Sequence, residues 1–130
     1  MIGMDTNVLV RFLVQDDPLQ SAQASAAFAR LTSADRGYLS TVVLVETYWV
    51  LNRAYTLPPE EVLSALEEVV SCEEISVQDS AQATSAFQAA RAGADFADAL
   101  IAAACAAQGC RTVLSFDEGT RRTLNFTTPA

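Results

Sequence analysis

The hydrophobic positions of this chain alternate between short apolar runs and longer segments with a helical period. The short runs predict strands at residues 2–4, 38–40, 72–77 and 111–116, with 123–127 as a candidate last strand. The periodic segments predict helices at residues 8–13, 18–33, 41–55, 59–71, 79–91 and 95–108, and a short helical turn after residue 119. Strands that alternate with helices indicate an α/β fold with a parallel sheet and right-handed crossovers.

Two helices differ in how clearly they show a buried face. In the segment 59–71, valines and leucines recur at helical spacing and four glutamates fall on the opposite side, which predicts an amphipathic helix. In the alanine-rich segment 18–33, we expect Leu19 to face the core.

The segment 93–108 places two carboxylates at the start of an apolar helix. Asp95 and Asp98 are three residues apart and share a face, while Leu100, Ile101, Ala104 and Cys105 form a stripe that we expect to be buried. One interpretation is structural, with Asp95 as the N-cap and Asp98 in the first turn, both favoured by the helix dipole. The other interpretation is a site for a cation.

The helix predicted at 41–55 is apolar over nearly its whole surface, yet it carries Glu46 in its middle. A buried Glu without a partner would cost several kcal/mol or lose its charge. The sequence therefore predicts a partner, which is either Arg53 or a metal ion shared with other acids. Trp49 of the same helix is expected in the core or in an interface.

Two further acids directly follow predicted strands. Asp5 comes after the run at 2–4 and Asp117 after the run at 111–116. The carboxyl ends of parallel strands share one edge of the sheet, where α/β proteins bind ligands. Asp5 is alternatively the N-cap of the next helix. Acids gathered at such an edge repel one another without cations, and oxygen ligands without His or Cys select Mg²⁺ or Mn²⁺.

Composition narrows the chemistry. The 130 residues are 51% hydrophobic, which predicts one domain spanning residues 1–130. The chain has no His, and all eight basic residues are Arg, which excludes catalytic triads, His-based zinc sites and lysine chemistry. The three cysteines are expected to be buried and reduced. The N-terminus does not read as a signal peptide and no run is long enough to span a membrane, so we expect a cytoplasmic protein.

The net charge of −8 argues against a nucleic-acid partner, because phosphate binding relies on Lys and Arg. Divalent cations held by the acids would change the field that a substrate meets. Charge alone therefore leaves the partner open.

Four motifs resemble the PIN domains of VapC-type bacterial toxins. They are MDTNVLVRFLVQDDP at the N-terminus, VVLVET in the centre, DFADALIAAACAAQGC, and VLSFDEG near the C-terminus. They occur in the family's order and cover essentially the whole chain. The resemblance implies a three-layer α/β fold, in which helices flank a central, mostly parallel sheet of about five strands.

The same resemblance implies a metal-dependent endoribonuclease, the toxin component of a VapBC-type toxin–antitoxin module. Its catalytic acids, which bind Mg²⁺ or Mn²⁺, would be Asp5, Glu46, Asp98 and Asp117, with Asp95 as a further candidate ligand. Thr6, Asn7 and Ser115 would be the supporting polar residues. A homodimer and a cognate antitoxin protein are also implied.

Contacts with RNA or the antitoxin would then rest on arginines near the acids. The candidates are Arg11, Arg53, Arg121 and Arg122, each of which alternatively forms a salt bridge with a surface acid. Two other functions stay open. A phosphatase or receiver domain would explain Asp5, although both normally use a lysine, and a catalytically inactive PIN-like module would serve only protein interaction.

Overall fold

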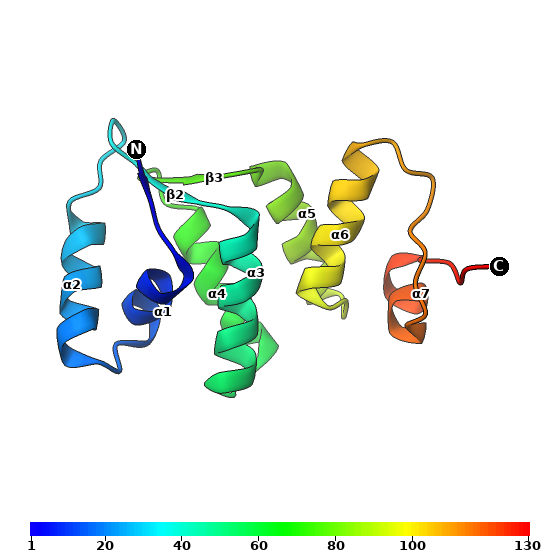
Figure 1. Cartoon of the computed structure of the whole chain (residues 1–130), viewed down its shortest axis with the longest axis horizontal. Helices are drawn as coiled ribbons and strands as arrows, with labels where there is room; N and C mark the ends of the chain where they lie inside the picture. Colours follow the sequence, from blue (N-terminus) through cyan, green and yellow to red (C-terminus); the bar gives the residue numbers. More distant parts are fainter. The chain divides into compact units, whose positions relative to one another are not determined.

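The computed structural model describes all residues from Met1 to Ala130. Contacts within the chain divide it into two units, Met1–Gln78 and Asp79–Ala130, which are described in turn. In Figure 1 the first unit runs from blue to green and the second from yellow-green to red.

The first unit contains a parallel sheet of three strands in the order β1-β2-β3, as the alternating pattern predicts. The strands are β1 (Ile2–Gly3), β2 (Gly37–Leu39) and β3 (Ile75–Val77). Helices connect them, with α1 and α2 between β1 and β2, and α3 to α4 between β2 and β3 (Figure 1).

The prediction of about five strands is wrong, because the sheet has three. Residues 111–116 form no strand and contribute only an isolated parallel bridge between Leu114 and Thr127. The predicted strand at 123–127 begins inside a helix, since α7 (Glu118–Leu124) extends through Leu124. An apolar run this short is compatible with a strand and with the end of a helix, so its hydrophobic period does not distinguish the two structures.

The first unit has four α-helices and one π-helical segment, and three of its helices begin after a polar N-cap. They are α1 (Thr6–Val14), α2 (Pro18–Ala29), α3 (Thr41–Trp49), the π-helical segment η1 (Val50–Ala54) and α4 (Pro59–Val70). The side chains of Asp5, Asp17 and Ser40 each accept a hydrogen bond from a backbone N–H in the first turn. Pro18 and Pro59 stand in the first turn, where their missing N–H costs nothing.

The core of the first unit confirms the amphipathic pattern of α4. Its Val62, Leu63, Leu66 and Val69 are buried together with residues of α1 and α3. The expectation for Leu19 is wrong, since its side chain is 69% exposed. The buried face of α2 instead runs through Ser21 and Ala24, and Phe28 stacks on Phe12 of α1 with ring centroids 4.0 Å apart. Leu19 lies on the other side of that helix.

The second unit is built on a helical hairpin of α5 (Ser80–Arg91) and α6 (Phe96–Ala107), followed by α7. Gly93, with a φ of +113°, makes the turn between the first two helices. Phe87 of α5 stacks on the fully buried Phe96 of α6 with centroids 5.1 Å apart. Phe96 thus anchors the first turn of α6.

The stripe predicted on α6 is correct only in part. Leu100 is buried, but Ile101 is 47% exposed, Ala104 is exposed and Cys105 is half-buried. The buried face starts one turn earlier, at Phe96 and Ala99, because the aromatic ring of Phe96 offers more apolar area than an alanine.

The cysteines do not match the expectation of buried thiols. All three are free as expected, but Cys72 and Cys110 are exposed and Cys105 is half-buried. Both exposed cysteines follow a helix end, where the chain turns at the surface. None of the helices is both long and apolar enough to cross a membrane.

Candidate metal centre

Asp5 has both of the roles that the sequence suggested for it, as an acid after a strand and as the N-cap of a helix. It follows β1 and Met4, and it is also the N-cap of α1, where its Oδ1 accepts a hydrogen bond from the Val8 N–H at 3.1 Å. Its side chain is exposed. One carboxylate oxygen is therefore fixed by the helix, and the other is left for a ligand.

Glu46 is exposed, so the expectation that it is buried is wrong. The buried face of α3 runs through Val43, Leu44 and Thr47, which leaves Glu46 at its edge. Its hydrogen-bond partner is not Arg53 but Thr6, whose Oγ1 donates to Glu46 Oε1 at 2.9 Å. Thr6 directly follows Asp5, and this contact brings the starting turn of α1 beside α3.

In the second unit, the structural interpretation of Asp95 and Asp98 is confirmed. Asp95 is the N-cap of α6, and its Oδ2 accepts a hydrogen bond from the Asp98 N–H at 3.1 Å. The Asp98 carboxylate lies in the first turn and is half-buried. Burial raises the pKa of Asp98, and the negative charges of Asp95 and Asp117 raise this pKa further.

Asp117 caps α7 through a hydrogen bond from the Gly119 N–H to its Oδ1 at 2.8 Å. Ser115 Oγ accepts from the Asp117 N–H at 3.1 Å and lies 3.1 Å from the hydroxyl of Thr120. Thr120, which is buried, is also 2.8 Å from the Asp117 carbonyl oxygen. Sequence reasoning missed Thr120, because a capping box has Glu or Gln three residues after the N-cap and Thr at that position gives no such signal.

The acids thus gather as two groups, one in each unit. Thr6, the residue after Asp5, is bonded to Glu46, while the negative charges of Asp95 and Asp117 act on Asp98. Neither unit by itself brings three such side chains close enough to hold a metal ion. The donor set nevertheless fits Mg²⁺ or Mn²⁺, since all donors are carboxylate oxygens and Asp98 carries an unfavourable charge that a cation would offset.

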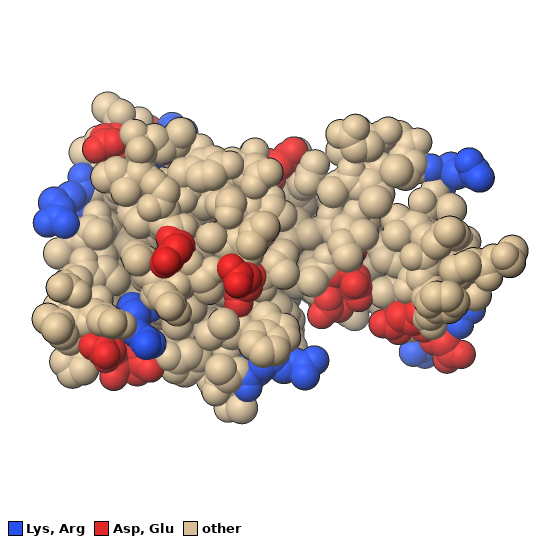
Figure 2. All heavy atoms as spheres, viewed as in Figure 1, with Lys and Arg blue, Asp and Glu red and all other residues tan.

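Of the four candidate arginines, Arg11 and Arg121 have acidic or polar partners. Arg121 lies 3.6 Å from Glu118 and donates a hydrogen bond to Thr128 at 2.6 Å, whereas Arg53 and Arg122 are exposed. Figure 2 shows acidic and basic side chains scattered over the face in view, without a broad basic patch. The salt-bridge interpretation therefore holds for Arg121.

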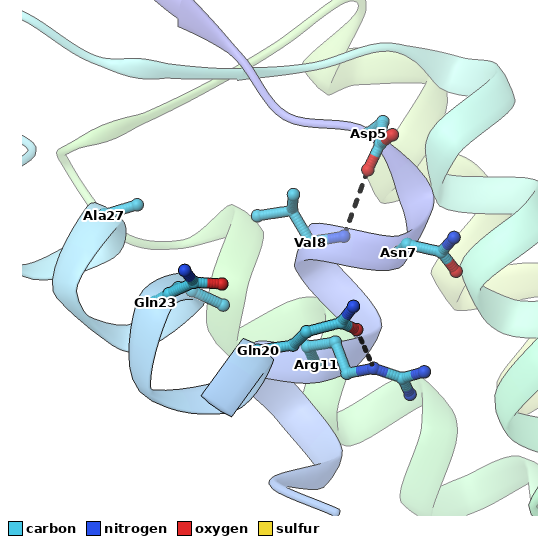
Figure 3. Close-up of a pocket in the computed structure, with 8 residues that line it drawn as sticks. Asp5, Asn7, Val8, Arg11, Gln20, Gln23 and Ala27 are labelled. Carbon is cyan, nitrogen blue, oxygen red and sulfur yellow. Dashed lines mark hydrogen bonds between the residues drawn. The ribbon is translucent and has the colours of Figure 1, made fainter. Parts of the chain in front are cut away.

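Arg11 belongs to a small polar network in the first unit. Its Nη1 lies 3.2 Å from Asp16 Oδ1 and donates to the Tyr55 hydroxyl at 3.0 Å, while its Nε donates to Gln20 Oε1 at 2.8 Å. Tyr55 in turn donates to Asp16 Oδ2 at 2.7 Å. The guanidinium is therefore held from three sides, and Figure 3 shows its bond to Gln20.

Replacing Tyr55 by Phe should raise the pKa of Asp16. The Tyr55 hydroxyl bond is the main cause of the lowered pKa of this carboxyl, and Arg11 contributes less. Because the folded-state pKa is lowered, the network stabilises the protein above the ordinary Asp pKa, and this stabilisation is lost as the pH falls through the lowered value. An NMR titration of the side-chain carboxyl carbon measures the change.

The matched control is Tyr38→Phe, because Tyr38 lies on β2 outside this network. That variant should leave the titration of Asp16 unchanged. An Asp16 pKa that stays low in Tyr55→Phe would show that the Tyr55 hydroxyl is not the main cause of the lowered value.

Comparison with known proteins identifies the family. A sequence profile described as the PIN domain matches residues 2–124, which includes all of the candidate acids and extends over both units. A search of curated proteins finds no match. The PIN domain is a nuclease fold that is often metal-dependent, and the α/β architecture with a parallel sheet agrees with it. The chain belongs to the PIN domain family.

Proposed function

We propose that this protein is a metal-dependent endoribonuclease and the toxin component of a VapBC-type toxin–antitoxin module. Asp5, Glu46, Asp98 and Asp117 would bind Mg²⁺ or Mn²⁺, with Asp95 as helix cap and candidate further ligand. The observation that carries this proposal is the way the side chains of the acids are held.

Three of the four acids have one oxygen engaged and the other available. Asp5 Oδ1 and Asp117 Oδ1 accept from helix N–H groups, and Glu46 Oε1 accepts from Thr6. Such bonds orient a carboxylate without using up its capacity for a ligand. Asp98, whose pKa is raised by burial and by neighbouring acids, is the group that gains most from a nearby cation.

A bound Mg²⁺ or Mn²⁺ would polarise the phosphodiester and lower the pKa of an attacking water. The contribution of the chain is to fix the carboxylates. Thr6 holds Glu46, while Ser115 and Thr120 brace the turn that carries Asp117. No His or Lys is present to act as a general acid or base, so the proposed chemistry depends on these acids.

Partners follow from the same proposal. Arg11, Arg53, Arg121 and Arg122 would contact RNA or the carboxylates of a cognate antitoxin, for which bidentate guanidinium groups are suited. We further propose a homodimer acting in the cytoplasm. The exposed Trp49 on α3, with 60% of its surface accessible, offers apolar area for such an interface.

The test is cleavage of a panel of structured RNAs by purified protein with Mn²⁺ or Mg²⁺, compared with EDTA. Glu46→Gln keeps the size of the side chain and removes its charge. The matched control is Glu60→Gln, an exposed Glu in the first turn of α4. The proposal expects cleavage that EDTA and Glu46→Gln abolish and Glu60→Gln preserves. RNA cleavage that does not need a metal would contradict the proposal. A protein that neither cleaves RNA nor binds Mn²⁺ would contradict it as well.

A further inference from the structure

A cavity of about 350 Å³ opens between α1 and α2, directly beside Asp5 (Figure 3). Its walls come from both helices of the first unit and comprise Asp5, Asn7, Val8, Arg11, Gln20, Gln23, Ala24 and Ala27. Its volume lies in the range of small-molecule sites. A ligand in it would lie next to one of the proposed metal-binding acids.

The walls combine a small apolar surface with amide groups. Val8, Ala24 and Ala27 present methyl groups, which leave room for a flat ring. Gln20 and Gln23 extend from α2 towards α1 in Figure 3. The Gln23 amide is exposed and has no partner within the protein, so its donor and its acceptor are both available.

Arg11 fixes the orientation of the second amide. Its Nε donates to Gln20 Oε1 at 2.8 Å, so the oxygen of Gln20 is engaged and its NH₂ group is left as a donor. Arg11 is itself held by Tyr55 and Asp16. The cavity therefore has one pre-oriented donor, Gln20, and one adaptable amide, Gln23.

The charge around the cavity disfavours an anion inside it. Arg11 is the only cation lining it, and Asp16 offsets that charge at 3.2 Å, with Asp17 also acting on Arg11. Asp5 adds a further negative charge to the wall. A neutral ring with hydrogen-bonding edges suits this environment better than a phosphate group.

We infer that this cavity binds the nucleobase of a nucleotide that flanks the scissile phosphate in a single-stranded RNA. The inference rests on the proposed function and adds a sequence-reading position to it. Unpaired bases are recognised through hydrogen bonds to their edges, and glutamine amides pair with base edges in two-bond arrangements. Gln20 would meet an acceptor on the base, and Gln23 would adapt to the remaining edge.

The test measures base binding separately from cleavage. The four uncharged nucleosides are titrated into metal-free protein with EDTA, while NMR follows the signals of Ala24 and Ala27. We expect at least one nucleoside to shift these signals saturably. Gln23→Leu should weaken that binding by about tenfold, the effect of losing one good base-edge contact. The matched control, Gln88→Leu, changes an exposed Gln of α5 and should leave binding unchanged.

A second arm maps the cleavage positions on RNA with Mn²⁺. Gln23→Leu should retain Mn²⁺ binding but lose base preference at one position beside the cut. If nucleosides bind and no RNA is cut, the proposed function fails and the base site stands. If RNA is cut while no nucleoside binds, or if Gln23→Leu binds nucleosides as wild type does, the base site is wrong. If no nucleoside binds and Gln23→Leu loses a protein that co-purifies with wild type, the cavity is a protein contact and not a base site.

Discussion

The Asp98→Asn variant should cleave RNA more than about a hundredfold more slowly than wild type. Substituting a residue that only holds a metal ligand in place already lowers activity by up to about a hundredfold, and Asp98 would itself be a ligand. Asn keeps the shape of the side chain and removes the charge that would bind the ion. The first turn of α6 should persist, because its cap is the Asp95 carboxylate bonded to the backbone N–H of residue 98. Single-turnover cleavage with Mn²⁺ measures the loss.

The stability of the same variant provides a second readout. Because the pKa of Asp98 is raised in the folded protein, its charge costs stability as the pH rises through the raised value. Metal-free Asp98→Asn should therefore be no less stable than wild type at neutral pH and should lack this pH dependence. A variant that unfolds easily would mean that its lost activity reports misfolding.

The control for Asp98→Asn is Asp79→Asn. Asp79 caps α5 through a hydrogen bond from the Gln82 N–H at 2.9 Å, and Asn caps helices equally well. Both variants lose one acid from a helix start in the same unit. Equal losses of activity in the two would contradict a specific role for Asp98.

Phe96→Ala should lower the free energy of unfolding by about 3–5 kcal/mol, the usual cost of truncating a buried Phe. Phe96 is fully buried, stacks on Phe87 and stands between Asp95 and Asp98. Its loss would leave a cavity under the turn that holds these acids. Chemical denaturation followed by circular dichroism measures the change.

Phe116→Ala is the matched control, because the side chain of Phe116 is 84% exposed. It should change the free energy of unfolding by less than about 0.5 kcal/mol, as is usual for surface substitutions. A similar loss in both variants would show that burial does not determine the contribution of these aromatic rings.

The helices were predictable because each carries a local signal. Caps such as Asp79 and Asp95, the prolines of α2 and α4, and the amphipathic period of α4 all act within one turn or one face of a helix. The number of strands was not predictable in this way. A strand requires a partner far along the chain, and residues 111–116 have only one bridge, to Thr127.

The residues of the candidate site were predictable where they carry a local signal, but their long-range contacts were not. Acids that follow short apolar runs or begin helices, such as Asp5 and Asp98, stand out from the sequence itself. The burial of Glu46 was misjudged because an apolar helix can still expose one edge, as α3 does. Its partner, Thr6, lies 40 residues away, and no local pattern specifies such a contact.

Mn²⁺ binding to the metal-free protein and to two single variants tests the central claim most directly. Asp5→Asn changes an acid of the first unit and Asp117→Asn an acid of the second. Isothermal titration should show that wild type binds Mn²⁺ and that each variant binds it at least about tenfold more weakly, because each of these acids would be a metal ligand. Wild-type affinity retained in either variant, or no binding by the wild type, would contradict the proposed role of these acids as metal ligands.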